Sequence, residues 1–210
     1  MCPLCEKRRA KRFCPAQGEA ICAPCCGSYR EVTLDCPLSC PHLRASRAHG
    51  ARETSLEPPP PVSPELRLPP HFGGDHEDLL RSLCAEIGGF WAESPALSDP
   101  DLLDVLRHVA QTWAAQRAGV VFESHPTGAL REGLYRRLQD ALREYRPPQR
   151  GLAAPPPQRA EELEMAVVYL ARLVRLRANG RPGSRLCLEW LAPEAPHAAT
   201  QPVGSLIVAP

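Results

Sequence analysis

Eight of the ten cysteines of this 210-residue chain lie within its first forty residues, and a histidine follows directly behind them. They are Cys2, Cys5, Cys14, Cys22, Cys25, Cys26, Cys36 and Cys40, followed by His42. Residues 1–52 contain few other large apolar side chains, so a hydrophobic core alone does not offset the entropy that this segment loses on folding. The segment therefore needs cross-links to fold, and the cysteines can provide them as disulfides or as metal ligands.

The start of the chain favours metal. Met1-Cys2-Pro3 begins neither a basic n-region nor an apolar h-region, and no apolar run approaches the roughly 18 residues of a membrane span. We therefore expect a cytoplasmic protein that does not enter a membrane. Because cysteines in a reducing compartment serve as metal ligands rather than as disulfide partners, we predict a metal-binding module over residues 1–52.

Two Cys-x-x-Cys pairs predict a first zinc site. Cys2 and Cys5 form one pair, and Cys22 and Cys25 form the other. This spacing places two sulfurs on one side of a tight turn, about a tetrahedral edge apart, which suits zinc. All four ligands are cysteines, which is typical of closed structural sites rather than catalytic ones.

The remaining ligands predict a second zinc site, interleaved with the first. Its ligands would be Cys14, Cys26, Cys36 and Cys40, with His42 as the alternative to Cys40. Cys25 and Cys26 are adjacent, so their side chains diverge and can serve different metals. Two zinc ions are thus the expected cofactors. An iron–sulfur cluster is the alternative, because four thiolates suit it equally well.

The order of these ligands resembles that of B-box and related treble-clef zinc fingers. The resemblance covers residues 2–42 and rests on three motifs: Cys2-x2-Cys5, a basic stretch that leads to Phe13-Cys14, and Ile21-Cys22-x2-Cys25. It implies a small two-zinc cross-brace module used for protein–protein contact. The chain departs from the family pattern at Gln17, where a ligand is expected, and it lacks the paired histidines of B-boxes.

A proline-rich linker over residues 53–74 separates this module from the rest of the chain. Beyond it, apolar residues recur at helical spacing and predict a mainly α-helical domain of about four helices over residues 75–210. We expect the helices at about 75–87, 98–119, 127–145 and 159–178, with Gly88-Gly89 ending the first. Proline-rich loops are expected at about 147–157 and 192–202. Short extended or strand segments are expected at 120–122, 186–191 and 205–208.

Other conspicuous side chains in the helical domain fit a structural role. Cys84 and Cys187 lie between apolar residues, so we predict buried small hydrophobic groups rather than ligands. Trp91, Trp113 and Trp190 are predicted to pack in the core.

A basic strip follows the first cysteine pair, consisting of Lys7, Arg8, Arg9, Lys11 and Arg12. Two interpretations are open. The strip could contact a polyanion, with Phe13 or Tyr29 available to stack on bases. Alternatively, it could balance the charge of about −2 that each zinc bound by four thiolates carries.

The sequence contains no phosphate loop, dinucleotide fingerprint, nucleophile elbow or HExxH motif, so we expect a non-enzymatic protein. The net charge of +1 argues against a bulk polyanion binder. The leading hypothesis is a zinc-binding adaptor or regulator whose finger contacts a protein partner. Two alternatives are a nucleic-acid-binding regulator that uses residues 7–12 and a redox- or metal-responsive switch.

Overall fold

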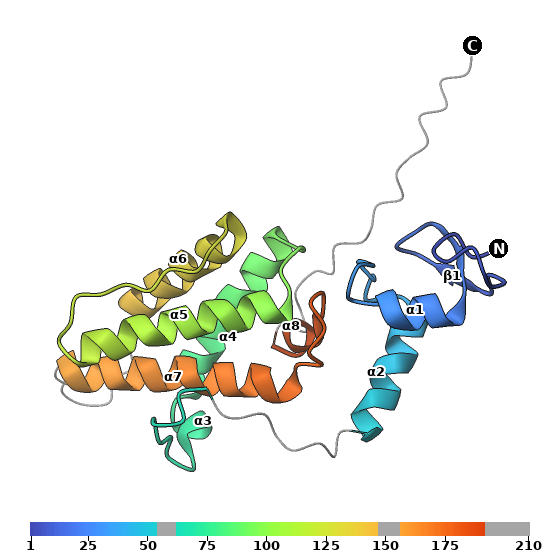
Figure 1. The fold of residues 1–210 in the computed structure, drawn as a ribbon. Coiled ribbons are helices and arrows are strands. Elements are labelled where there is room, and N and C mark those ends of the chain that lie inside the picture. The colour runs from blue at the N-terminus through green and yellow to red at the C-terminus, as the bar shows by residue number, and fades with distance from the viewer. Residues whose placement is uncertain (54–61, 147–155, 192–210) are drawn as a thin grey trace.

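A computed structural model describes residues 1–53, 62–146 and 156–191 of the chain (Figure 1). These residues are mostly helical, with a two-stranded sheet near the N-terminus. They form eight helices and not four, although the prediction of about four covered residues 75–210 alone, where five of the eight begin. The four predicted helices correspond to the four long helices of the C-terminal part. The other helices have little apolar periodicity, so apolar spacing does not predict them. No helix in these ranges combines the length and apolar character needed to cross a bilayer.

The finger, residues 1–53, consists of a β-hairpin and two helices. Strands β1 (Arg12–Cys14) and β2 (Glu19–Ile21) pair antiparallel, with Phe13 opposite Ala20. Gly18 turns the chain at a φ of +71°, a conformation that glycine adopts without steric cost. Helix α1 (Ala23–Tyr29) follows β2 directly, and α2 (Pro41–Glu53) ends the finger. Ile21, Leu34 and Leu43 are buried among the cysteines, so the finger has its own small core.

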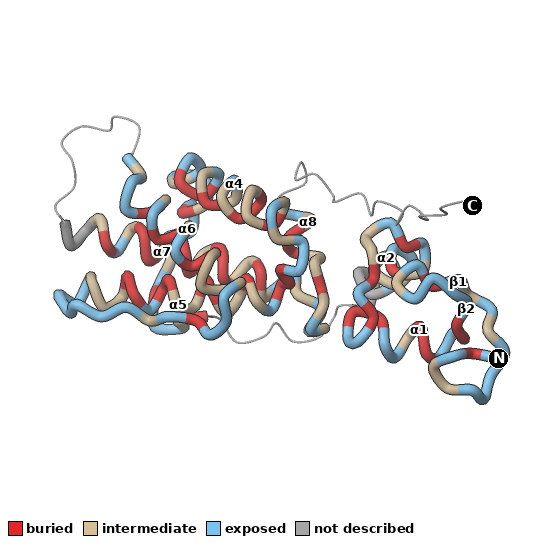
Figure 2. The backbone as a smooth tube through the Cα atoms, turned by 90° about the horizontal axis from the view of Figure 1, so that it is seen from above, coloured by how far each residue is buried: buried red, intermediate tan, exposed pale blue. Residues whose placement is uncertain are grey.

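The C-terminal part is a helical domain built on four long helices: α4 (Glu77–Glu93), α5 (Asp99–Arg117), α6 (Ala129–Glu144) and α7 (Pro156–Arg177). Helix α5 packs along α7 and also contacts α6, which packs on α4 (Figures 1 and 2). Ser98 begins α5 with a capping box, because its hydroxyl accepts from the amide of Asp101 while the Asp101 carboxylate accepts from the amide of Ser98.

Helix α4 continues through Gly88-Gly89, where the sequence predicted its end. The glycines allow close packing instead. A Cβ at Gly89 would lie 2.7 Å from a guanidinium nitrogen of Arg137, and one at Gly133 would lie 3.2 Å from the ring of Phe90. Gly89 and Gly133 thus lie where α4 and α6 meet, so Gly89 marks a helix contact and not a helix stop.

The prediction of a strand over 186–191 was also wrong, because these residues form helix α8 (Leu186–Leu191). A distant carboxylate caps this helix. Asp99, which is fully buried, accepts hydrogen bonds from the amides of Cys187 and Leu188 and from the hydroxyl of Ser184. The residues 120–122 have no strand pairing, and the predicted strand at 205–208 lies outside the described residues.

Part of the predicted linker packs on the helical domain. Val62, Leu66 and Phe72 belong to its core, and the Arg172 guanidinium of α7 donates to the carbonyls of Val62 and Leu66 at 2.8 and 2.7 Å. Helix α3 (Phe72–Asp75) lies in this segment. The predicted loops at 147–157 and 192–202 lie largely outside the described residues.

The two cysteines and three tryptophans predicted to be buried in the helical domain differ in their exposure. Cys187, Trp91 and Trp113 are buried, and Cys84 is half-buried. Trp190 is 42% exposed, so its predicted core position was wrong. The guanidinium carbon of Arg177 lies 4.0 Å from its ring centroid, and this stacking covers one face of the indole.

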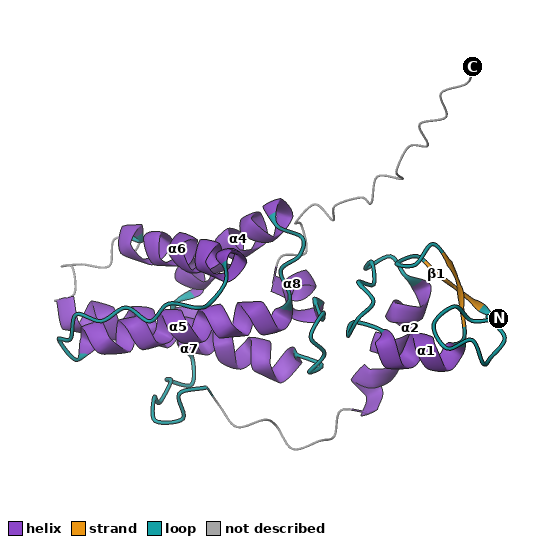
Figure 3. Ribbon diagram, turned by 45° about the horizontal axis from the view of Figure 1, so that its top comes forward, coloured by secondary structure: helices purple, strands orange, loops and turns teal. Residues whose placement is uncertain are grey.

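The finger contacts the helical domain through the loop between α7 and α8 (Figure 3). Glu31 is the centre of this contact. Its carboxylate is 4% exposed, pairs with Arg47 of α2 at 2.8 Å and accepts from the Asn179 amide at 3.2 Å. Its backbone carbonyl accepts from the Gly183 amide at 2.8 Å. Arg47 also pairs with Glu189 of α8, so one cluster joins both parts of the chain.

Candidate metal centre

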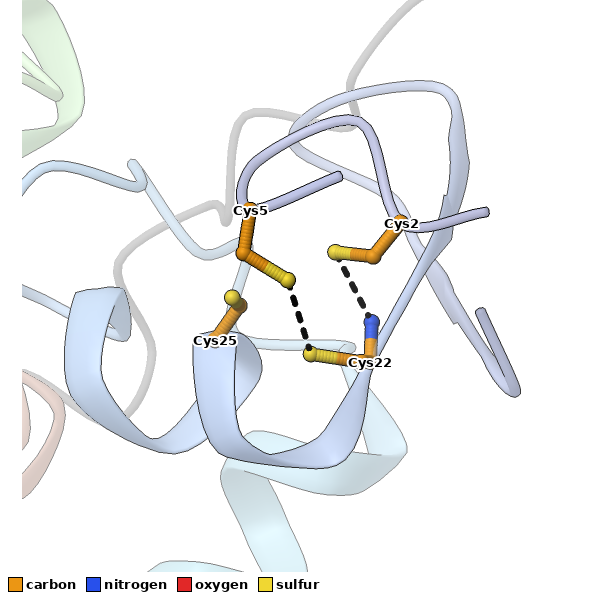
Figure 4. A group of neighbouring side chains, drawn as sticks. All are labelled: Cys2, Cys5, Cys22 and Cys25. Carbon is orange, nitrogen blue, oxygen red and sulfur yellow. Dashed lines mark hydrogen bonds between the residues drawn. The ribbon is translucent and has the colours of Figure 1, made fainter. Parts of the chain in front are cut away.

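Four cysteine sulfurs converge in the finger, as Figure 4 shows. The Sγ atoms of Cys2, Cys5, Cys22 and Cys25 all lie within 4.8 Å of one another. The Sγ atoms of Cys5 and Cys22 are 3.8 Å apart. Zinc–sulfur bonds of about 2.3 Å in a tetrahedron place the sulfurs about 3.8 Å apart, so this pair already has the spacing of a tetrahedral edge.

Local structure places each of these four side chains. Cys2 and Cys5 flank a tight turn, in which the Cys2 carbonyl accepts from the amide of Glu6 at 2.8 Å. Cys22 is the N-cap of α1 and Cys25 lies in its first turn, so helical geometry sets the second pair. The hairpin β1–β2 returns the chain from the first pair to the second. The Cys22 amide donates to the Cys2 sulfur at 3.2 Å and links the two pairs (Figure 4).

The surroundings distribute the protons unequally over the four thiols. Burial opposes ionisation of Cys2, but the amides of Cys22, Leu4 and Cys5 outweigh it and lower the pKa of Cys2 to about 6. The amide of Lys7, followed in importance by that of Arg8, lowers the pKa of Cys5 despite burial. Hydrogen bonding with Cys22, together with burial, raises the pKa of Cys25 to about 12.

This donor set fits a soft divalent metal in a closed site. Four sulfur donors at tetrahedral spacing suit zinc, and iron is the other metal for which such a set is known. Cys2, Cys22 and Cys25 are buried, and Cys5 is half-buried. The four sulfurs fill a tetrahedral shell, which leaves no coordination position for water or a substrate. The arrangement can therefore hold a metal that stabilises the fold.

The second predicted set is gathered less closely. Cys14, Cys26, Cys36 and Cys40 are all buried in the same cluster as the first set. Burial raises the pKa of Cys36, and the neighbouring Cys40 and Cys14 thiols raise it further. However, the sulfurs of these four cysteines do not all lie within 4.8 Å of one another, as those of the first set do. Among the described residues, the first set is the one group that fulfils this criterion. The second site therefore stays a prediction.

The surroundings of the second set contain residues that the sequence did not single out. Arg30 is buried, and its guanidinium lies 3.5 Å from the Cys26 sulfur. His42, the alternative ligand, lies in the first turn of α2 and is half-buried. Neither Arg30 nor Glu31 belongs to a ligand motif, so the sequence carried no signal for them.

A serine–histidine–aspartate array also occurs in the helical domain. His108 Nδ1 lies 2.7 Å from Ser124 Oγ, and its Nε2 lies 3.9 Å from Asp104. Ser124 donates its single hydroxyl proton to Gln111 at 2.8 Å, so the imidazole is the donor to the serine. A serine that receives a proton from histidine is not activated as a nucleophile. The array attaches the loop that follows α5 to that helix.

No protein-family model matches this chain, and no curated protein or solved structure is significantly similar to it. The resemblance of residues 2–42 to B-box and treble-clef fingers therefore has no support from known proteins.

Proposed function

We propose that this protein is a non-enzymatic adaptor whose finger is folded by a zinc ion bound to Cys2, Cys5, Cys22 and Cys25. The convergence of these four sulfurs within 4.8 Å is the observation that carries the proposal. A closed set of four thiolates favours a structural metal. The finger would then offer a fixed surface to a protein partner, and the proposal rests on the first site alone.

The arrangement of the finger supports its resemblance to treble-clef fingers. A cysteine-bearing turn is followed by the β1–β2 hairpin and then by α1, which carries the second cysteine pair. The docking of the finger on the helical domain through Glu31 supports the adaptor role, because it joins the two parts into one composite surface.

The adaptor role is tested by comparing the full chain with a Cys22→Ser/Cys25→Ser variant. Proteins retained by the first and lost from the second are identified by mass spectrometry, and one is purified and mixed with the full chain. We expect a stable complex that forms only with the zinc-loaded finger. A complex that survives deletion of residues 1–53 would contradict the role of the finger.

A redox switch is the second candidate, and the partial exposure of Cys5 favours it. Cys5 is the accessible member of the set, and its sulfur lies 3.8 Å from that of Cys22. Hydrogen peroxide would convert the Cys5 thiolate to a sulfenic acid with loss of hydroxide. The Cys22 thiolate would then form the disulfide and displace the second hydroxide, so that two electrons reduce the peroxide bond.

This candidate is tested with zinc-loaded protein, a chromogenic zinc chelator and mild peroxide. Zinc release that a thiol reductant reverses, together with a Cys5–Cys22 disulfide found by peptide mapping, would support the switch. Zinc that stays bound under the same treatment would exclude it.

A further inference from the structure

A cavity of about 330 Å³ opens beside the cysteine cluster. Lys7 and Arg8, from the turn after the first cysteine pair, line one part of it. Ser28 and Tyr29, from the last turn of α1, line another. The cavity therefore combines two cations, a hydroxyl group and an aromatic ring. Tyr29 is 40% exposed, so its ring is accessible to a ligand.

The cations at this cavity are not used for internal ion pairs. Lys7, Arg8, Arg9 and Lys11 are exposed, and none of them makes a salt bridge with a carboxylate in the described part of the chain. Several arginines of the helical domain differ in this respect. Arg117 and Arg137, for example, bind the carboxylates of Glu164 and Glu86 at 2.6 and 2.7 Å. The charge of the basic strip thus remains available to a partner.

Charge balance within the finger does not consume this strip. Residues 1–49 contain eight Lys or Arg and four Asp or Glu side chains, a net charge of +4. One zinc ion with four thiolates contributes about −2, so the finger stays positive when the first site is filled. The acidic residues Glu31 and Asp35 are already paired with Arg47 and Arg185, so their carboxylates do not neutralise the strip.

Aromatic rings accompany these cations. Besides Tyr29 at the cavity, Phe13 lies in β1 next to Arg12 and is 62% exposed. Exposed rings beside uncompensated cations are the chemistry of single-stranded nucleic acid binding, in which bases stack on the rings and phosphates contact the cations. An acidic peptide would satisfy the cations but would bring no base to stack on the rings.

We propose that the finger binds single-stranded nucleic acid, with one base stacked on Tyr29 in the cavity and the adjoining phosphates held by Lys7 and Arg8. This inference goes beyond the adaptor role, and it requires only that zinc folds the finger. Ser28 can donate to or accept from the edge of the stacked base. Arg9, Lys11 and Arg12 extend the contact along the backbone of the strand.

The test is fluorescence anisotropy with a fluorescein-labelled thymidine dodecamer and zinc-loaded protein. We expect Lys7→Gln/Arg8→Gln to weaken binding at least about tenfold. The slope of the logarithm of the binding constant against the logarithm of the salt concentration (the salt slope) should become shallower by about 1.4, the value for two lost single-strand phosphate contacts. Tyr29→Ala should weaken binding about tenfold at an unchanged salt slope, and Tyr29→Phe should preserve it. Arg81→Gln/Arg136→Gln, which removes two exposed cations of the helical domain, is the matched control.

Zinc content is measured for every variant, so a loss of binding with zinc retained is not a folding defect. Binding that does not change in Tyr29→Ala would overturn the stacked base. If the Arg81→Gln/Arg136→Gln control weakens binding equally, the loss of affinity comes from the overall charge of the protein and the proposed contacts of Lys7 and Arg8 are contradicted. Displacement of the dodecamer by a polyglutamate peptide at equal anionic charge would also contradict the proposal, because it would show a polyanion surface without base stacking.

Discussion

The amide of Gly183 donates a hydrogen bond to the carbonyl oxygen of Glu31 at 2.8 Å, across the junction between the finger and the helical domain. A Cβ at position 183 would lie 3.2 Å from that same oxygen. The two backbones therefore approach as closely as glycine permits. Because Glu31 also binds Arg47 and Asn179, this single contact is part of a cluster that sets how the two parts meet.

Gly183→Ala is expected to weaken the junction, because the added methyl group displaces the Glu31 carbonyl. Overpacking of this kind costs about 1 kcal/mol or more. Gly27→Ala is the matched control, since a Cβ at Gly27 meets no atom within 4 Å and α1 gains a better helix former. Urea denaturation monitored by tryptophan fluorescence should show a lower midpoint for the first variant only. Equal midpoints would show that the contact does not contribute to stability.

Glu31 and Glu6 offer a second matched comparison, because both have a φ of +52°. Replacement by glycine relieves the same backbone strain at each position. Glu6 is exposed, so Glu6→Gly should leave the free energy of unfolding unchanged or slightly higher. Glu31→Gly removes the buried partner of Arg47 and should cost about 2 kcal/mol. If both variants have the same stability, the Glu31 carboxylate does not hold the junction.

Asp99 tests the cap of α8. Asp99→Ala removes the acceptor of the Cys187 and Leu188 amides and of the Ser184 hydroxyl, and we expect it to destabilise the domain by about 3 kcal/mol. Ser98→Ala removes the neighbouring N-cap of α5 and should cost about 1 kcal/mol. Thermal unfolding of the two variants compares these costs. A smaller effect for Asp99→Ala than for Ser98→Ala would contradict the importance of this cap.

The pH dependence of metal binding follows from Cys25. Its neighbour Cys22 and burial raise its pKa to about 12, so in metal-free protein this thiol keeps its proton at neutral pH. Zinc must displace that proton, and its affinity should therefore fall as the pH falls from about 8 to about 6. The pKa of Cys2 is lowered to about 6, so Cys2 adds to this loss only near the lower limit. Competition with a chelator of known affinity measures how the zinc affinity changes with pH, and an affinity that stays constant between about pH 8 and 6 would contradict this prediction.

The first metal set could be predicted from the sequence because a local motif determines each half of it. Cys2 and Cys5 share one turn, and Cys22 and Cys25 share the start of one helix, so only the meeting of the two pairs depends on the tertiary fold. The second set lacks such pairs. Its four cysteines are separated by larger and unequal intervals, so spacing alone does not bring their sulfurs to bonding distance.

The long helices of the C-terminal part were predictable from apolar periodicity, and the errors arose where distant residues decide the structure. Helix α8 depends on Asp99, which is remote in the sequence, and Gly89, inside α4, lies against the Arg137 side chain of α6. Glu31 carried no signal at all. Its role comes from a junction formed by the α7–α8 loop, which no local pattern around Glu31 describes.

The zinc content of protein purified without added metal tests the central claim most directly. The chain and a Cys84→Ser control, which alters a half-buried thiol of the helical domain, should contain the same amount of zinc. Cys22→Ser/Cys25→Ser should contain at least one equivalent less. Equal zinc in all three proteins, or a visible iron–sulfur absorption in place of zinc, would contradict a zinc ion held by Cys2, Cys5, Cys22 and Cys25.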